Sequence, residues 1–99
     1  MQLKWTELAA KDLDHIETHI ATENSPFVAI DVVLKVLNSS ELILSNHPKA
    51  GRPGRVSGTR ELVIDGIPFI VIYRIVDRLD QLQILRVLHD AQQWPSEYQ

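Results

Sequence analysis

The chain contains no cysteine. Disulfide bonds, thiolate metal sites and a cysteine nucleophile are therefore excluded, and packing alone must stabilise the fold. Long hydrophobic runs are also missing, because the longest apolar run, residues 67–73, includes Pro68 and is too short to cross a bilayer. The opening residues, MQLKWTELAAKDL, lack the apolar stretch of a signal peptide. We therefore expect a cytoplasmic protein that has no membrane partner.

Charge is distributed unevenly along the 99 residues. Residues 1–47 carry three Lys and seven Asp or Glu, a net charge of −4, whereas residues 48–99 carry seven Lys or Arg and six acids, a net charge of +1. With 44% hydrophobic residues, this length suffices for one hydrophobic core. We expect a single domain over residues 1–99, acidic in its first half only.

Two helices are predicted in the first half, after an extended segment over residues 2–5. Thr6 is suited to cap the first helix, which ends near Glu23. Its apolar residues recur at helical spacing: Ala9, Leu13, Ile16 and Ile20. The Ser-Pro pair at residues 25–26 begins a second helix with a wider apolar stripe, which ends at the His-Pro pair, residues 47–48. The short connection predicts an antiparallel helical hairpin.

Three strands are predicted in the second half. They cover approximately residues 59–65, 67–76 and 82–89. The middle strand is apolar on both faces, which is typical of a central strand covered by helices on one side. The preceding segment, residues 48–58, is rich in glycine and proline and is predicted to be a loop without regular structure. The fold class is α+β, with an N-terminal strand and a two-helix hairpin packed on a mainly antiparallel sheet. Trp94 and Pro95 are expected to pack the C-terminal turn on that sheet.

Cations gather in this loop and on the strands. Residues 49–60 contain four of them and no acid: Lys49, Arg52, Arg55 and Arg60. Arg74 and Arg86 follow at strand positions where apolar side chains are usual, so they are expected to be paired or functional. Glu61 and Asp90 are available as salt-bridge partners. An anionic partner, either nucleic acid or an acidic protein segment, would suit this surface, and a solvated loop is the alternative.

The histidines raise two further questions of chemistry. His15 and His19 share a helix face, but Glu17 lies about 200° around the helix from His15 and is misplaced for a zinc-protease motif. We interpret this segment as a solvated polar face and expect no metal and no cofactor. His89, at the end of the last strand, is a candidate general acid or base because imidazole titrates near neutrality. A purely structural histidine is the alternative.

The order of these features resembles the RelE/ParE superfamily of toxins from bacterial type II toxin–antitoxin pairs. The resemblance covers nearly the whole chain. It is carried by Leu3-Lys4-Trp5-Thr6, Asp12-Leu13, Gly51-Arg52-Pro53-Gly54-Arg55, Gly58-Thr59-Arg60-Glu61-Leu62, Tyr73-Arg74, Ile84-Leu85-Arg86-Val87-Leu88-His89 and Trp94-Pro95. It implies a small toxin that is neutralised by a cognate antitoxin, whose C-terminal region wraps around it.

The superfamily divides by target. RelE-like members cut messenger RNA, usually on the ribosome, and commonly have an arginine after the aromatic residue of the middle strand. Here Phe69 is followed by Ile70, and no tyrosine adjoins His89, so the resemblance is closer to ParE-like members, which poison DNA gyrase. It implies a toxin that is not an enzyme, with these target-binding residues: Arg52, Arg55, Arg60, Arg74 and Arg86.

Two alternatives stay open. One is a RelE-like messenger RNA endonuclease, in which Arg60, Arg86 and His89 would be the catalytic residues, since cleavage through the 2′-hydroxyl needs a base, an acid and cations around the phosphate. The other is a non-toxic binding module that has the same fold.

Overall fold

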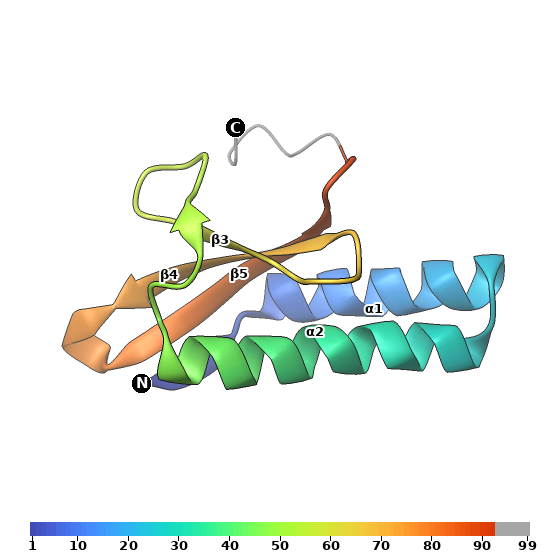
Figure 1. Ribbon diagram of the computed structural model, residues 1–99, viewed down its shortest axis with the longest axis horizontal. Coiled ribbons are helices and arrows are strands. Elements are labelled where there is room, and N and C mark those ends of the chain that lie inside the picture. The colour runs from blue at the N-terminus through green and yellow to red at the C-terminus, as the bar shows by residue number, and fades with distance from the viewer. Residues whose placement is uncertain (93–99) are drawn as a thin grey trace.

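The protein has two layers, a helical hairpin and a mixed sheet (Figure 1). The computed structural model describes residues 1–92. The elements are β1 (Gln2–Trp5), α1 (Glu7–Glu23), α2 (Pro26–Asn46), β2 (Arg52–Pro53), β3 (Arg60–Val63), β4 (Phe69–Val76), a 3-10 turn η1 (Asp77–Leu79) and β5 (Gln81–His89). Within this part of the chain the strands form one sheet in the order β1-β5-β4-β3-β2. The β1–β5 pair is parallel and the other pairs are antiparallel, which confirms the predicted α+β fold.

Both helices begin where their capping residues predict. Thr6 Oγ1 accepts a hydrogen bond from the Ala9 amide at 3.3 Å, and Ser25 Oγ accepts one from the Val28 amide at 3.2 Å. Thr6 Oγ1 also donates to the Ile84 carbonyl at 2.7 Å, so the same side chain fixes the start of α1 against β5. The predicted helix ends are confirmed, since α1 ends at Glu23 and α2 at Asn46. Within residues 1–92, neither helix has the length and hydrophobicity needed to cross a membrane.

The prediction that residues 48–58 contain no regular structure is wrong for β2, whose two residues pair with β3. Arg52 lies opposite Glu61, and Pro53 lies opposite Arg60. The Gly54 amide donates to the Thr59 carbonyl at 2.8 Å, so the nitrogen of Pro53 faces away from β3 and no ladder hydrogen bond is lost. A proline is therefore tolerated in this short edge strand.

The central position of β4 is confirmed, because its residues 69–73 are buried on both faces. Val71 and Tyr73 belong to the large core under the helices, together with Val36 and Leu44 of α2. Ile70, Ile72 and Leu88 form a separate small cluster on the other face of the sheet. The predicted packing of Trp94 and Pro95 lies outside the described residues.

Candidate functional site

The sheet register places three of the predicted arginines on the face that the helices do not cover. Arg52 lies opposite Glu61 of β3, and Ile72 of β4 lies opposite both Glu61 and Arg86. Directly paired residues direct their side chains to the same face, and Ile72 is part of the cluster away from the helices. Arg74, two residues further along β4, shares that face and donates to Gln83 Oε1 at 2.8 Å.

A buried carboxylate organises the loop that carries Arg55. This loop, which connects β2 and β3, rises on the side of the sheet away from the helices (Figure 1). Glu61 is only 3% exposed. Its Oε2 atom accepts a hydrogen bond from the Arg55 amide at 3.0 Å, and its Oε1 atom accepts from Arg52 Nε at 3.1 Å and from Arg52 Nη2 at 3.0 Å. The Arg52 side chain nevertheless stays 56% exposed, so it has room to contact a partner.

Arg86 is held by an acid that neither of the predicted pairings included. Its Nε and Nη2 atoms donate to the two carboxylate oxygens of Asp12 in α1, at 2.7 and 3.0 Å. Asp12 Oδ2 also accepts from the Val87 amide at 3.0 Å, and the two charged side chains are only 12% and 10% exposed. The suggested partners were wrong for this arginine, because Glu61 binds Arg52 and Asp90 lies beside His89. Arg86 thus forms a largely buried structural ion pair.

Arg60 lies on the opposite, helix-facing side of the sheet, where it supports the segment after α2. It is paired with Tyr73 in the register, and its Nη1 atom donates to the carbonyl of Gly51 at 2.8 Å and to that of Lys49 at 3.3 Å. The Tyr73 hydroxyl donates to the Pro48 carbonyl at 2.7 Å and accepts from the Gly51 amide at 2.8 Å. Two strand residues therefore fix the backbone of residues 48–51.

Tyr73 is a structural support that sequence reasoning did not single out. It is fully buried, and this burial raises the pKa of its phenol, although the Gly51 hydrogen bond and the Arg60 charge act in the opposite direction. A Cβ atom at Gly51 would lie 2.7 Å from both Cε1 and Oη of Tyr73, so the close approach needs glycine. The available signal was a tyrosine in a mainly apolar central strand, since a buried hydroxyl requires partners.

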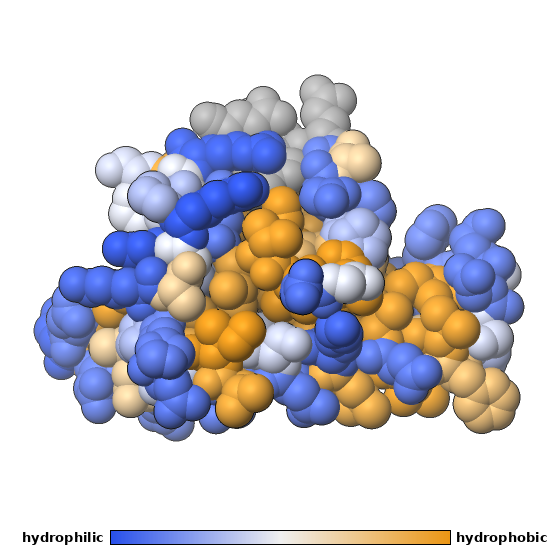
Figure 2. Space-filling model, in the orientation of Figure 1, coloured by the Kyte–Doolittle hydropathy of each residue, from blue (hydrophilic) through white to orange (hydrophobic). Residues whose placement is uncertain are grey.

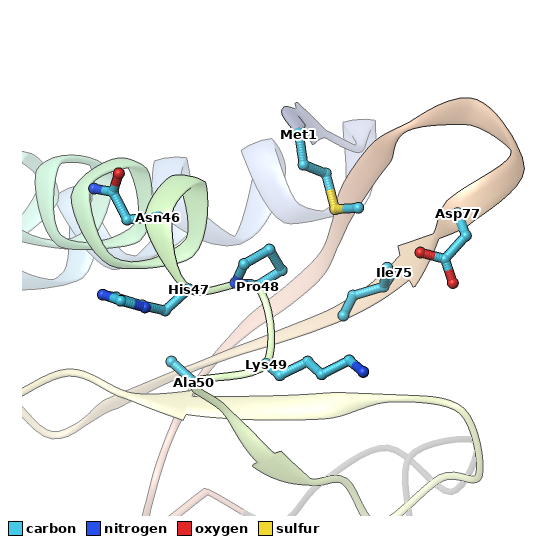
Figure 3. Close-up of a pocket in the computed structure, with 8 residues that line it drawn as sticks. All are labelled: Met1, Asn46, His47, Pro48, Lys49, Ala50, Ile75 and Asp77. Carbon is cyan, nitrogen blue, oxygen red and sulfur yellow. The ribbon is translucent and has the colours of Figure 1, made fainter.

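An open groove of about 710 Å³ adjoins this fixed segment (Figure 3). Its lining comes from the start of the chain, the end of α2 and the segment after it, the end of β4 and the start of η1: Met1, Asn46, His47, Pro48, Lys49, Ala50, Ile75 and Asp77. Arg60 and Tyr73 donate hydrogen bonds to the carbonyl groups of Lys49 and Pro48, respectively. These bonds determine the shape of one wall of the groove.

His89 lies in a different hollow, which we call the histidine pocket. It has a volume of about 310 Å³ and is lined by His15, Ile16, His19, Ile20, Phe69, His89 and Gln92. His15 and His19 are exposed, as predicted for a polar face, but the fold brings them to the same pocket as His89. No group of three or more His, Asp or Glu within residues 1–92 is arranged to hold a metal ion.

The neighbours of His89 indicate which of its ring nitrogens accepts a hydrogen bond. Nδ1 accepts a hydrogen bond from the Ala91 amide at 3.0 Å, and Asp90 Oδ1 lies 3.3 Å from the same nitrogen. The neutral ring therefore carries its proton on Nε2. The Phe69 ring meets it edge to face, with the two centroids 5.3 Å apart. The three nuclease candidates are not brought together, because Arg60 binds the 48–51 segment, Arg86 binds Asp12 and His89 borders α1.

Comparisons with known proteins agree with this fold. The family model described as the ParE toxin of type II toxin–antitoxin system, parDE, matches residues 3–94. The Sinorhizobium fredii protein Y4kP, whose name describes it as a candidate toxin, is 39% identical over 95 residues, which cover 96% of this chain and 94% of that protein.

Solved structures give the same result. The chromosomal ParDE system from P. aeruginosa matches with a TM-score of 0.80 and 34% identity, over 90% of this chain and 95% of that chain. The RelBE2 toxin–antitoxin complex from Mycobacterium tuberculosis matches with a TM-score of 0.62 and 23% identity over 92% of each chain, a likeness of fold. Since the family model covers nearly the whole length and two relatives exceed 30% identity, the chain belongs to the ParE toxins of type II toxin–antitoxin systems, within the RelE/ParE superfamily.

Proposed function

We propose that this toxin poisons DNA gyrase without making a covalent change itself, and that a cognate antitoxin neutralises it. The observation that carries the target is the dispersal of Arg60, Arg86 and His89 over three separate sets of contacts. Cleavage through a 2′-hydroxyl needs a base, an acid and cations around one phosphate. His89 Nδ1 accepts from the Ala91 amide and lies 3.3 Å from Asp90 Oδ1, so the neighbours of this ring are neither Arg60 nor Arg86. The match to the ParE family model supports the same target.

The helix-free face of the sheet is the surface that we assign to target binding. It carries Arg52 and Arg74, with Arg55 on the loop above. Figure 2 shows strongly hydrophilic side chains gathered over this end of the molecule. Arg74 is exposed, and its Nε atom donates a hydrogen bond to Gln83. Its terminal amino groups are therefore directed to solvent or to a partner. Cations held on a rigid sheet suit an anionic partner such as DNA engaged by gyrase.

Binding of an antitoxin is supported by a different surface, the outer stripe of α2. Phe27 is 80% exposed, and Ile30 and Leu34 are each 47% exposed, at positions that share one helix face. Hydrophobic side chains extend over the α2 side of the molecule in Figure 2. An exposed apolar stripe of this kind is typical of a protein interface. Two solved relatives, ParDE and RelBE2, are described as toxin–antitoxin assemblies, which supports a partner of the same class.

The target is tested with purified toxin and gyrase. We expect inhibition of supercoiling or trapping of cleaved DNA, and in cells DNA damage before messenger RNA disappears. Arg74→Gln should weaken gyrase inhibition about tenfold or more, because a hydrogen bond to a charged group contributes about 1.5–3 kcal/mol. Arg78→Gln is the matched control, since it removes the same charge from exposed η1 and should leave inhibition unchanged.

Two outcomes would contradict the proposal. Position-specific messenger RNA cleavage that requires His89, with gyrase unaffected, would favour the endonuclease. Absence of growth inhibition on expression would favour a non-toxic binding module. The antitoxin is tested by co-expression with the small protein encoded beside the toxin, where separate elution of the two proteins on size exclusion would reject the pairing.

A further inference from the structure

The histidine pocket has an apolar body and a polar rim. Ile16, Ile20 and Phe69 supply hydrophobic surface, and the lining contains no Asp, Glu, Lys or Arg. Its volume of about 310 Å³ suits a ligand of one ring and one small polar group. The pocket lies between α1 and the end of β5, and its lining includes none of the arginines assigned to target binding.

The wall at the end of β5 offers mainly hydrogen-bond donors to a ligand. His89 Nδ1 already accepts from the Ala91 amide at 3.0 Å, and Gln92 Oε1 already accepts from the His89 amide at 3.2 Å. In the neutral ring the Nε2–H of His89 can still donate, as can the amide NH₂ of Gln92, whose Oε1 atom keeps one further lone pair. This balance favours a ligand with acceptor atoms.

The opposite wall adds two imidazoles. His15 and His19 lie four residues apart on α1 and therefore stand one above the other on the same face. Of the nearby carboxylates, Asp12 is bound to Arg86 and the Val87 amide, and Asp90 Oδ1 lies 3.3 Å from Nδ1 of His89.

We propose that the histidine pocket binds an oxyanion, a carboxylate or phosphate group, that is carried on a small aromatic or aliphatic body. The body would pack on Phe69, Ile16 and Ile20, and the oxyanion would accept from His89, Gln92 and the α1 histidines. Within residues 1–92, no group of three or more His, Asp or Glu is arranged to hold a metal ion.

The test uses full-length ¹⁵N-labelled toxin and histidine side-chain NMR spectra. Phenyl phosphate and phenylacetate are titrated separately, which distinguishes the two oxyanions, and phenylacetamide is the neutral control. We expect saturable shifts of the His15, His19 and His89 resonances with at least one of the two anions. The remaining histidine, His47, lines the other groove and serves as the internal control.

One further measurement keeps the test decisive. His15→Gln/His19→Gln should weaken binding about tenfold or more, while an unchanged melting temperature shows that these exposed positions do not affect folding. Equal shifts at His47, equal binding of phenylacetamide, or no saturable shift with either anion would overturn the proposal.

Discussion

Separating Arg86 from Asp12 should strongly destabilise this toxin. Three hydrogen bonds converge on one carboxylate, at 2.7, 3.0 and 3.0 Å, and both side chains are about nine-tenths buried. Removing one member of a buried pair leaves the other charge without its partner, which costs about 3–5 kcal/mol. The residual exposure argues for the lower end, near about 3 kcal/mol. For a domain of this size, that corresponds to a fall in Tm of about 12–24 °C.

The assay is urea unfolding of purified Asp12→Asn, Arg86→Met and the double variant, followed by circular dichroism. Each single variant should lose about 3 kcal/mol, and the double variant should lose clearly less than the sum, because the pair couples the two sites. Lys11→Gln is the control on the same helix. It breaks an exposed ion pair with Glu7 of 3.7 Å, for which a loss of at most about 0.5 kcal/mol is expected.

The reasoning would be refuted if each single variant lost less than about 1 kcal/mol, the value typical of a surface pair. A coupling energy near zero would refute it too, because the stabilisation would then come from unrelated contacts of each residue. Growth assays give a second measurement, which is the toxicity of each variant. If Arg86 acts through the ion pair, toxicity should fall in parallel with stability in both Asp12 and Arg86 variants, whereas Arg74→Gln should lower toxicity with folding intact.

The remaining predictions concern the segment held by Tyr73. Tyr73→Phe removes the donor to Pro48 and the acceptor for the Gly51 amide, and should cost about 1–3 kcal/mol in urea unfolding. Because burial raises the pKa of Tyr73, the unfolded chain loses this proton first, so stability should fall as the pH rises above about 10 in the native protein and less steeply in Tyr73→Phe. Gly51→Ala should lower Tm by several degrees, about 1–3 kcal/mol, since its Cβ would lie 2.7 Å from the Tyr73 ring; a neutral effect would show that residues 48–51 are not tightly held.

The helices could be predicted because their signals are local. A capping hydroxyl lies three residues from the amide that it accepts from, as Thr6 does from Ala9 and Ser25 from Val28. The Pro48 that follows α2 acts on the adjoining backbone in the same way. Strand β2 was missed because its two residues are extended only by pairing with β3, and glycine and proline in a short segment give no signal of that pairing.

The arginines could be selected from sequence, but their partners could not. Arg86 and Asp12 are 74 positions apart, and the nearer acids, Glu61 and Asp90, are equally plausible by charge alone. The choice depends on where α1 crosses the sheet, which no local pattern contains. The same holds for the histidine pocket, where His15 and His19 predict a solvated face until the end of β5 brings His89 beside them.

Strand lengths explain why Asp12, and not a nearer acid, binds Arg86. β1 has four residues and β5 has nine, so β1 covers the edge of β5 only from Gln81 to Ile84. Beyond that point the Val87 amide needs an acceptor, and the chain, now in α1, supplies the Asp12 carboxylate. The second carboxylate oxygen, Oδ1, accepts a hydrogen bond from Arg86 Nη2, so the guanidinium lies at the same edge of the sheet. Arg86 is therefore largely withdrawn from the exposed charge of the sheet, although a count of arginines in the sequence includes it in full.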